Sequence, residues 1–242
     1  MRCLSLPSRT TGAPPARLCE LIEAVGTPAF TRELFLSVGS MLDAADAAVY
    51  AYDVERRARV VAAWGRGAGA LQWRTLAYAQ RFADHDPALH IPKPGEVVTT
   101  SIDTAELPDP GHRALLEETG FASRVVSVFP APGGGWYSLN VPRPAGSVPD
   151  RVFERFSRAA PVYASLVRRH LVSARLDARL TALCPELTPR EIAVCQSLLR
   201  GQSAAEVAAA LGIRATSVQT YRKRAYAKLG VSGLAELFQR LL

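Results

Sequence analysis

Three polar side chains near the carboxyl end of the chain have the chemistry to read the edges of DNA bases. Gln219, Thr220 and Lys223 are predicted to share one face of a helix over residues 216–229. A glutamine amide can form two hydrogen bonds to one base edge, and a lysine can reach guanine acceptors or a phosphate. Basic side chains beside them would neutralise phosphates and fix the register on the duplex. The DNA-contacting residues predicted on this helix are Gln219, Thr220, Arg222, Lys223, Arg224 and Lys228.

The residues around this helix predict the elements that would hold it. Capping boxes at Thr188–Glu191 and Ser203–Glu206 each mark a helix start. Gly201 and Gly212 follow as helix stops, and apolar residues recur at helical spacing between starts and stops. Residues 188–242 are therefore predicted to form four short helices, of which the second and third make a helix-turn-helix.

This stretch resembles the C-terminal DNA-binding domain of LuxR-type transcription regulators, which also occurs in NarL and FixJ response regulators. The residues that carry the resemblance are Leu187-Thr-Pro-Arg-Glu191, Gly201, Glu206-Val-Ala208, Leu211-Gly-Ile213, Ser217-Val218 and Lys228-Leu-Gly230. They span roughly a quarter of the chain. The resemblance implies DNA contacts from Gln219, Thr220 and Lys223, and contacts to the DNA backbone near Ser217, Arg222 and Lys228. Double-stranded DNA is the partner that it implies.

Three positions depart from the family pattern. Arg214 stands where a capping Ser is usual, Gln219 where Lys is common, and Leu234 where the last helix has an Arg. The first departure weakens the start of the recognition helix, because a side-chain cap is lost. The second leaves the base preference open.

A second group of residues, in the amino-terminal half, has the chemistry to bind a small molecule. Trp73, Tyr78 and Phe82 lie on a predicted helix over residues 71–83, and Asp86 follows in the loop before a proline. Aromatic rings exclude water from a ligand, while a carboxylate accepts an N–H or O–H. These four are the predicted ligand-binding residues. The alternative is structural: the Trp belongs to the core and the Asp caps a turn.

The amino-terminal half resembles the GAF/PAS-like sensor domains that precede LuxR-type modules. The resemblance is carried by Tyr-x3-Phe-x3-Asp-Pro at residues 78–87 and Pro-Gly-Glu-Val at 94–97. In acyl-homoserine-lactone receptors such an Asp accepts a hydrogen bond from the ligand amide. Trp73 matches a Trp of those receptors, whereas Ala77 and Ser101 replace a Tyr and a Trp. The ligand stays open between a lactone, an unidentified small apolar molecule, and none, with the domain serving dimerisation or docking.

A different class of function is a metal-dependent enzyme on the amino-terminal half. Asp84, His85, Asp86 and His90 would supply its ligands. They lie on a loop without regular ligand spacing, and such polar residues near a proline are usually solvated. We therefore expect no enzyme activity, no catalytic residue, no metal and no cofactor.

The amino-terminal half is predicted to be an α+β domain. Strand patterns at 47–53 and 59–64, and again at 123–129 and 136–141, form two hairpins between helical segments. Antiparallel hairpins argue against a phosphate-accepting receiver domain, which alternates strands and helices. The predicted architecture is a GAF/PAS-like sensor domain, an antiparallel sheet with flanking helices, followed by an all-α four-helix helix-turn-helix domain. The predicted segments are a flexible N-terminus at 1–14, the sensor or dimerisation domain at 15–180, a linker at 181–187 and the helix-turn-helix domain at 188–242.

The charge distribution agrees with a nucleic-acid partner at the carboxyl end. The chain of 242 residues has a formal net charge of +7. Residues 181–242 hold eight Lys or Arg and four Asp or Glu, so over half of the excess lies on about a quarter of the chain. Such a local excess is the electrostatic footprint of a DNA-binding domain.

The four cysteines show no metal-ligand or disulfide-framework spacing, which favours a reduced compartment. The first twenty residues lack the apolar core of a secretory signal, and no apolar run approaches the length of a membrane span. We therefore expect a cytoplasmic bacterial protein without a membrane partner.

A homodimer is expected, because one helix-turn-helix buries little surface and such modules commonly act in pairs. Two apolar stripes are candidate self-complementary surfaces. One follows Leu234, Leu237, Phe238 and Leu241, and the other follows the predicted helix from Val152 to His170.

Overall fold

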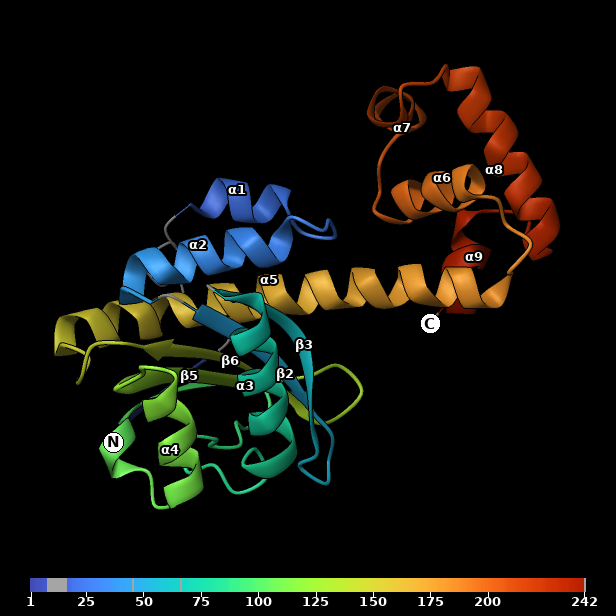
Figure 1. Cartoon of the computed structure of the whole chain (residues 1–242). Helices are drawn as coiled ribbons and strands as arrows, with labels where there is room; N and C mark the ends of the chain where they lie inside the picture. The colour runs from blue at the N-terminus through green and yellow to red at the C-terminus, as the bar shows by residue number, and fades with distance from the viewer. Residues whose placement is uncertain (8–16, 45, 66, 242) are drawn as a thin grey trace. The chain divides into compact units, whose positions relative to one another are not determined.

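The computed structural model describes residues 1–7, 17–44, 46–65 and 67–241 of the chain. These residues divide into two compact units, Met1–Arg168 and Arg169–Leu242. The boundary lies inside the long helix α5 (Asp150–Leu183), which contributes its first part to one unit and its second part to the other. Figure 1 labels most of the helices and strands of both units.

The N-terminal unit is built on one antiparallel sheet, which has six strands within the described residues. The strands are β1 (Arg2–Pro7), β2 (Asp46–Tyr52), β3 (Ala58–Gly65), β4 (Glu96–Asp103), β5 (Ser123–Pro130) and β6 (Trp136–Arg143). Their order across the sheet is β1-β4-β5-β6-β2-β3, and every neighbouring pair is antiparallel. The two hairpins predicted from the sequence are therefore confirmed as β2–β3 and β5–β6.

Helices cover both faces of the sheet (Figure 1). One face carries α1 (Leu18–Glu23), α2 (Phe30–Leu42) and the first part of α5, and the other carries α3 (Ala68–Arg81) and α4 (Pro110–Glu118). Successive strand residues point to opposite faces. Ala48, Tyr50 and Tyr52 of β2 accordingly join the core cluster of α3 and α4. All seven residues of β2 are buried. The predicted α+β architecture is confirmed.

The prediction of a flexible segment at residues 1–14 is wrong for its first half. Arg2–Pro7 form the edge strand β1, which pairs with β4 from Arg2 opposite Ser101 to Pro7 opposite Glu96. The sequence concealed this strand because its partner lies far along the chain. Residues 8–14 of that prediction lie outside the described residues.

The C-terminal unit contains the second part of α5 and four short helices. These are α6 (Pro189–Leu199), α7 (Ala204–Leu211), α8 (Ala215–Leu229) and α9 (Leu234–Leu241). Leu180 of α5 is fully buried against Leu187, Leu229 and Leu237. The predicted linker at 181–187 is thus too long, because α5 continues to Leu183 and packs on the helices that follow. The four predicted helices are confirmed.

The helix ends follow the predicted capping signals. Thr188 with Glu191 and Ser203 with Glu206 both form capping boxes. Gly212 ends α7 with a φ of 63°, a left-handed conformation that favours glycine. The N-cap of α8 is Arg214, whose side chain makes no capping hydrogen bond, as the departure from the family pattern predicted.

Within the described ranges, no helix combines the length and the apolar character that a membrane span would need.

Candidate DNA-binding surface and sensor-domain core

Helix α8 is fixed by the apolar side of its sequence. Val218, Ala225 and Leu229 are buried, and Tyr221 is half-buried beside them. Val218 packs with α6 and α7, while Ala225 and Leu229 pack with α6 and α9. Because this side of the helix is held by three neighbours, the orientation of the opposite side is determined as well.

The opposite side of α8 presents the predicted DNA-contacting residues. Gln219, Thr220, Lys223 and Arg224 are exposed, and Ser217 and Arg222 are half-buried. The Thr220 hydroxyl donates to the Thr216 carbonyl oxygen at 3.0 Å and can still accept one hydrogen bond. Among the described residues, no carboxylate pairs with Arg222, Lys223 or Arg224. Within the described chain these three consecutive cations have no carboxylate partner, so they are available for phosphates.

Lys228 differs from the other basic residues of α8. Its Nζ lies 2.7 Å from Glu191 Oε2 and donates to the Glu186 carbonyl oxygen at 3.1 Å. Burial alone would raise the pKa of Glu191, but the Lys228 and Thr188 hydrogen bonds hold it below its ordinary value. Lys228 is therefore the counterion of the buried carboxylate that caps α6. The sequence assigned it to phosphate, and its contacts within the domain account for it without DNA.

Lys228→Ala is expected to destabilise the C-terminal unit by about 1–3 kcal/mol, because it leaves the Glu191 carboxylate buried with fewer partners. Hydrogen exchange measured by mass spectrometry on peptides of α6 and α8 reports this local stability. Lys223→Ala is the matched control, since Lys223 is exposed and has no ion pair, and it should change stability by less than about 0.5 kcal/mol. Equal exchange in the two variants would contradict the role of Lys228.

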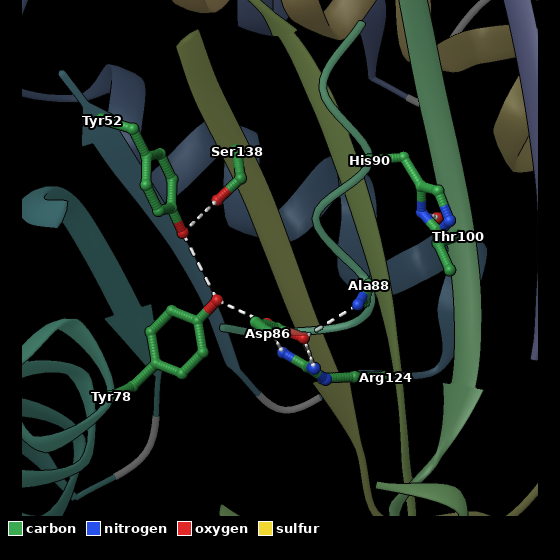
Figure 2. Close-up of polar contacts among 8 residues, drawn as sticks. All are labelled: Tyr52, Tyr78, Asp86, Ala88, His90, Thr100, Arg124 and Ser138. Atoms are coloured by element: carbon green, nitrogen blue, oxygen red, sulfur yellow. Dashed lines mark hydrogen bonds and ion pairs between the residues drawn. The ribbon is translucent and has the colours of Figure 1, made fainter. Parts of the chain in front are cut away.

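The core of the N-terminal unit contains a buried ion pair between Asp86 and Arg124. Figure 2 shows Arg124 and Tyr78 converging on the Asp86 carboxylate. Arg124 donates through Nη1 to Asp86 Oδ2 at 2.6 Å and through Nη2 to Oδ1. Tyr78 Oη donates to Oδ2 at 2.6 Å, and the Ala88 N–H donates to Oδ1 at 2.9 Å. Each carboxylate oxygen thus accepts two hydrogen bonds.

A chain of hydroxyl groups leads from β6 to this carboxylate. Tyr52 Oη lies 3.3 Å from Tyr78 Oη and 3.3 Å from Ser138 Oγ. Because Tyr78 uses its one proton on Asp86, Tyr52 must donate to Tyr78 and Ser138 to Tyr52. Burial, together with the Asp86 charge, raises the pKa of Tyr78, and burial raises that of Tyr52 to about 12. Both phenols stay protonated at neutral pH.

The ion pair keeps Asp86 charged inside the domain. Burial would raise the pKa of Asp86, but the Arg124 charge and the hydrogen bonds from Arg124 and Tyr78 hold it below its ordinary value. The side chains of both partners are almost completely buried, with relative exposures of 2% for Arg124 and 0% for Asp86. The ion pair is therefore part of the core of the N-terminal unit.

The four predicted ligand-binding residues do not all face the same part of the structure. Tyr78 and Phe82 do face the core, where Tyr78 lies beside Tyr50 and Phe82 stacks on His112. Trp73 does not, because 52% of its surface is exposed. Asp86 has four internal donors, so it has no unused lone pair for a ligand amide. In the described core, Asp86 therefore cannot accept the hydrogen bond from a lactone amide that the resemblance implied.

A small pocket lies beside the ion pair, between the sheet and helices α3 and α4. Its polar wall consists of Tyr50, Arg74, Tyr78, His112, Arg124 and Asn140. The enclosed space is about 20 Å³, room for about one water molecule, within a hollow of about 340 Å³ that includes solvent-open space. The sequence missed Arg74, His112 and Arg124, which come from three different elements.

The residues of the predicted metal alternative do not converge. Asp84 and Asp109 lie 2.6 Å and 3.2 Å from the two ring nitrogens of the half-exposed His85. His90 instead contacts the Thr100 hydroxyl, at 3.2 Å (Figure 2), and Asp86 is held by Arg124. Within the part of the chain that the structure describes, no three His, Cys, Asp or Glu side chains cluster as metal ligands would.

The comparison with protein families identifies the C-terminal unit. Residues 185–241 match the model for bacterial regulatory proteins of the luxR family. The match covers α6 to α9, including the α7–α8 pair and the exposed face of α8. A search of curated proteins finds no match.

Several solved structures show distant similarity to the chain. SdiA from Escherichia coli is 15% identical over 92% of this chain and 93% of its own, with a TM-score of 0.37. CepR2 from Burkholderia cenocepacia, titled as an N-acylhomoserine lactone dependent LuxR family transcription factor, is 11% identical over 63% and 93%, with a TM-score of 0.46. The GAF3 domain of Slr1393 from Synechocystis is 11% identical over 60% and 95%, with a TM-score of 0.43.

The family match and the arrangement of α6 to α9 lead to one class of protein. Residues 185–241 are a LuxR-family DNA-binding domain. The chain is a DNA-binding regulator of transcription, with an α+β domain on the N-terminal side.

Proposed function

We propose that α8 is a recognition helix that binds specific DNA sequences from the major groove. The observation that carries this proposal is its exposed face, where Gln219, Thr220 and Lys223 stand beside two arginines that have no carboxylate partner in the described chain. Amide and ammonium groups on such a face can read bases, and the arginines can bind phosphates. The protein would act in the cytoplasm by binding, without catalysing a reaction.

The proposal includes a homodimer that binds a roughly palindromic site. Leu237 and Leu241 of the predicted α9 stripe are buried in the domain, but Leu234 and Phe238 remain 39% and 41% exposed. They are four residues apart and so share one helix face. The α9 face is favoured over the predicted stripe on α5, because Phe156, Ala159 and Tyr163 of that stripe are buried.

Light scattering of the full-length protein should give a mass near twice the 26.1 kDa of one chain when it is free, and that mass plus the mass of one duplex when it is bound to a duplex that it selects. Phe238→Lys should shift the free protein toward the monomer, because it places a charge on the shared apolar surface. Leu76→Lys is the matched control, since Leu76 of α3 is 43% exposed. A wild-type monomer in both states would rule out this part of the proposal.

We propose further that the N-terminal unit senses a small ligand and controls DNA binding. The support is a pocket next to a buried polar network, at the point where the core holds aromatic rings and two guanidinium groups. Suppose that the protein has two conformations and that only one binds DNA well. A ligand that binds one conformation more tightly then shifts the DNA affinity, by at most the ratio of the ligand's affinities for the two conformations.

A further inference from the structure

The pocket between the sheet and helices α3 and α4 contains two buried polar atoms without a partner. Arg124 Nε and His112 Nε2 form no hydrogen bond to any described residue. Arg124 is 2% exposed and His112 is 1% exposed, and both line the pocket. Buried polar atoms in folded proteins nearly always have a hydrogen-bond partner. Two such atoms in one pocket point to a bound group that supplies the missing partner.

The wall of this pocket carries donors and positive charge. Arg74 and Arg124 both line it, whereas their carboxylate partners Asp46 and Asp86 do not. No Asp or Glu is among the described residues that line the pocket. The lining of the pocket thus contains two guanidinium groups, which are N–H donors, and no carboxylate acceptor among the described residues. Arg124 Nε–H can only donate, so its missing partner is an acceptor.

The imidazole of His112 is held in a fixed position at the wall of the pocket. It stacks on Phe82 at a centroid distance of 5.0 Å, and Asp109 caps the helix through the His112 N–H at 2.9 Å. Burial, with the nearby Arg124 charge, lowers the pKa of His112 to about 4. The ring is neutral at neutral pH and can present an N–H at Nε2.

We propose that this pocket binds a small carboxylate, one oxygen of which accepts hydrogen bonds from Arg124 Nε and His112 Nε2. The enclosed space has room for about one water-sized group, so it holds a headgroup oxygen and the rest of the ligand lies toward the opening. Leu115, Leu116 and Pro142 also line the pocket and offer the ligand an apolar surface. This inference rests on the proposed sensor function and names the chemical class of its ligand.

The test compares benzoate with benzamide, which have the same shape but differ in charge. Each is titrated into the full-length protein by calorimetry, with sodium chloride added to keep the ionic strength equal. Benzoate should bind at least about tenfold more tightly, because hydrogen bonds to a charged acceptor are stronger than those to a neutral one. Equal binding of the two, or no binding of benzoate, would overturn the inference.

His112→Phe supplies the decisive variant, because it keeps the stack on Phe82 and removes Nε2. It should weaken benzoate binding about tenfold or more. His85→Phe is the matched control, since His85 is half-exposed and does not line the pocket, and it should leave benzoate binding unchanged. Unchanged binding to His112→Phe would also overturn the inference. DNA binding is measured on the same samples, so a protein that selects DNA but ignores benzoate refutes the carboxylate pocket alone.

Discussion

Arg124→Met is expected to destabilise the N-terminal unit by about 3–5 kcal/mol, because it leaves the Asp86 carboxylate buried without its cation. Methionine is unbranched, like the aliphatic part of the arginine side chain, and can fill much of the same space. The loss of stability therefore reports the missing charge more than the lost packing. All three tryptophans, Trp64, Trp73 and Trp136, lie in this unit. Urea unfolding followed by tryptophan fluorescence therefore measures its stability without a signal from the other unit.

Arg158→Met is the matched control, because the Arg158 side chain is 64% exposed on α5. It should cost less than about 0.5 kcal/mol. The double variant Asp86→Asn/Arg124→Met should lose less stability than the two single variants together, since it removes both charges of one pair. Additive losses would show that the two side chains do not interact.

The cost of Arg124→Met should grow with pH. In the wild type the pKa of Asp86 lies below its ordinary value, so the contribution of the pair is present above the unfolded pKa and is lost as pH falls through the folded one. Without Arg124, burial would raise the pKa of Asp86, and the folded variant would hold a proton that the unfolded chain has released. The difference should therefore be larger at about pH 7 than at about pH 5.

Lys223→Ala is expected to weaken binding to the selected DNA sequence by about 1–3 kcal/mol and to relax specificity at one base position. Arg222→Ala should instead weaken binding to specific and random duplexes alike, and reduce the slope of affinity against salt by about one. The reason is that a base contact distinguishes sequences, whereas a phosphate contact does not. Fluorescence anisotropy on both duplexes at several salt concentrations separates the two effects.

The matched control for these variants is Lys93→Ala. Lys93 is exposed and lies in the N-terminal unit, so its removal lowers the net charge equally without touching α8. It should leave affinity and salt slope nearly unchanged. An effect equal to that of Lys223→Ala would assign the loss to net charge rather than to a base contact.

The parts of the fold that depend on residues close together in the sequence could be predicted from the sequence. The capping boxes at Thr188 and Ser203 operate over four residues, and both form as expected. The two β-hairpins also form, because each joins strands that follow one another along the chain. The strand β1 was missed because its partner β4 begins at Glu96, and no local pattern connects them.

Only some of the side chains in the predicted ligand group face the core, because helical phase decides which side chains reach it. Tyr78 lies on α3 and Phe82 is the residue that ends it, and both side chains are buried. Trp73 is five residues before Tyr78, which turns it about 140° away from Tyr78 around the helix axis. Its size suggested a core or ligand role, yet the helix directs it outward.

The Asp86–Arg124 pair joins residues 38 positions apart, so no motif spacing reveals it. One sequence signal was present. In β5, Arg124 alternates with Val126 and Val128, which pack in the core of α3 and α4. A charged residue on the core side of a strand requires a buried partner. That argument could have predicted an ion pair, although not which carboxylate completes it.

Selection from a pool of random duplexes by the full-length protein tests the central claim most directly. If α8 reads bases, the wild type should enrich one roughly palindromic sequence, and Gln219→Ala/Lys223→Ala should fail to enrich the same sequence while keeping its salt-dependent binding to random DNA. A wild type that enriches no sequence, or a variant that enriches the same one, would contradict the account.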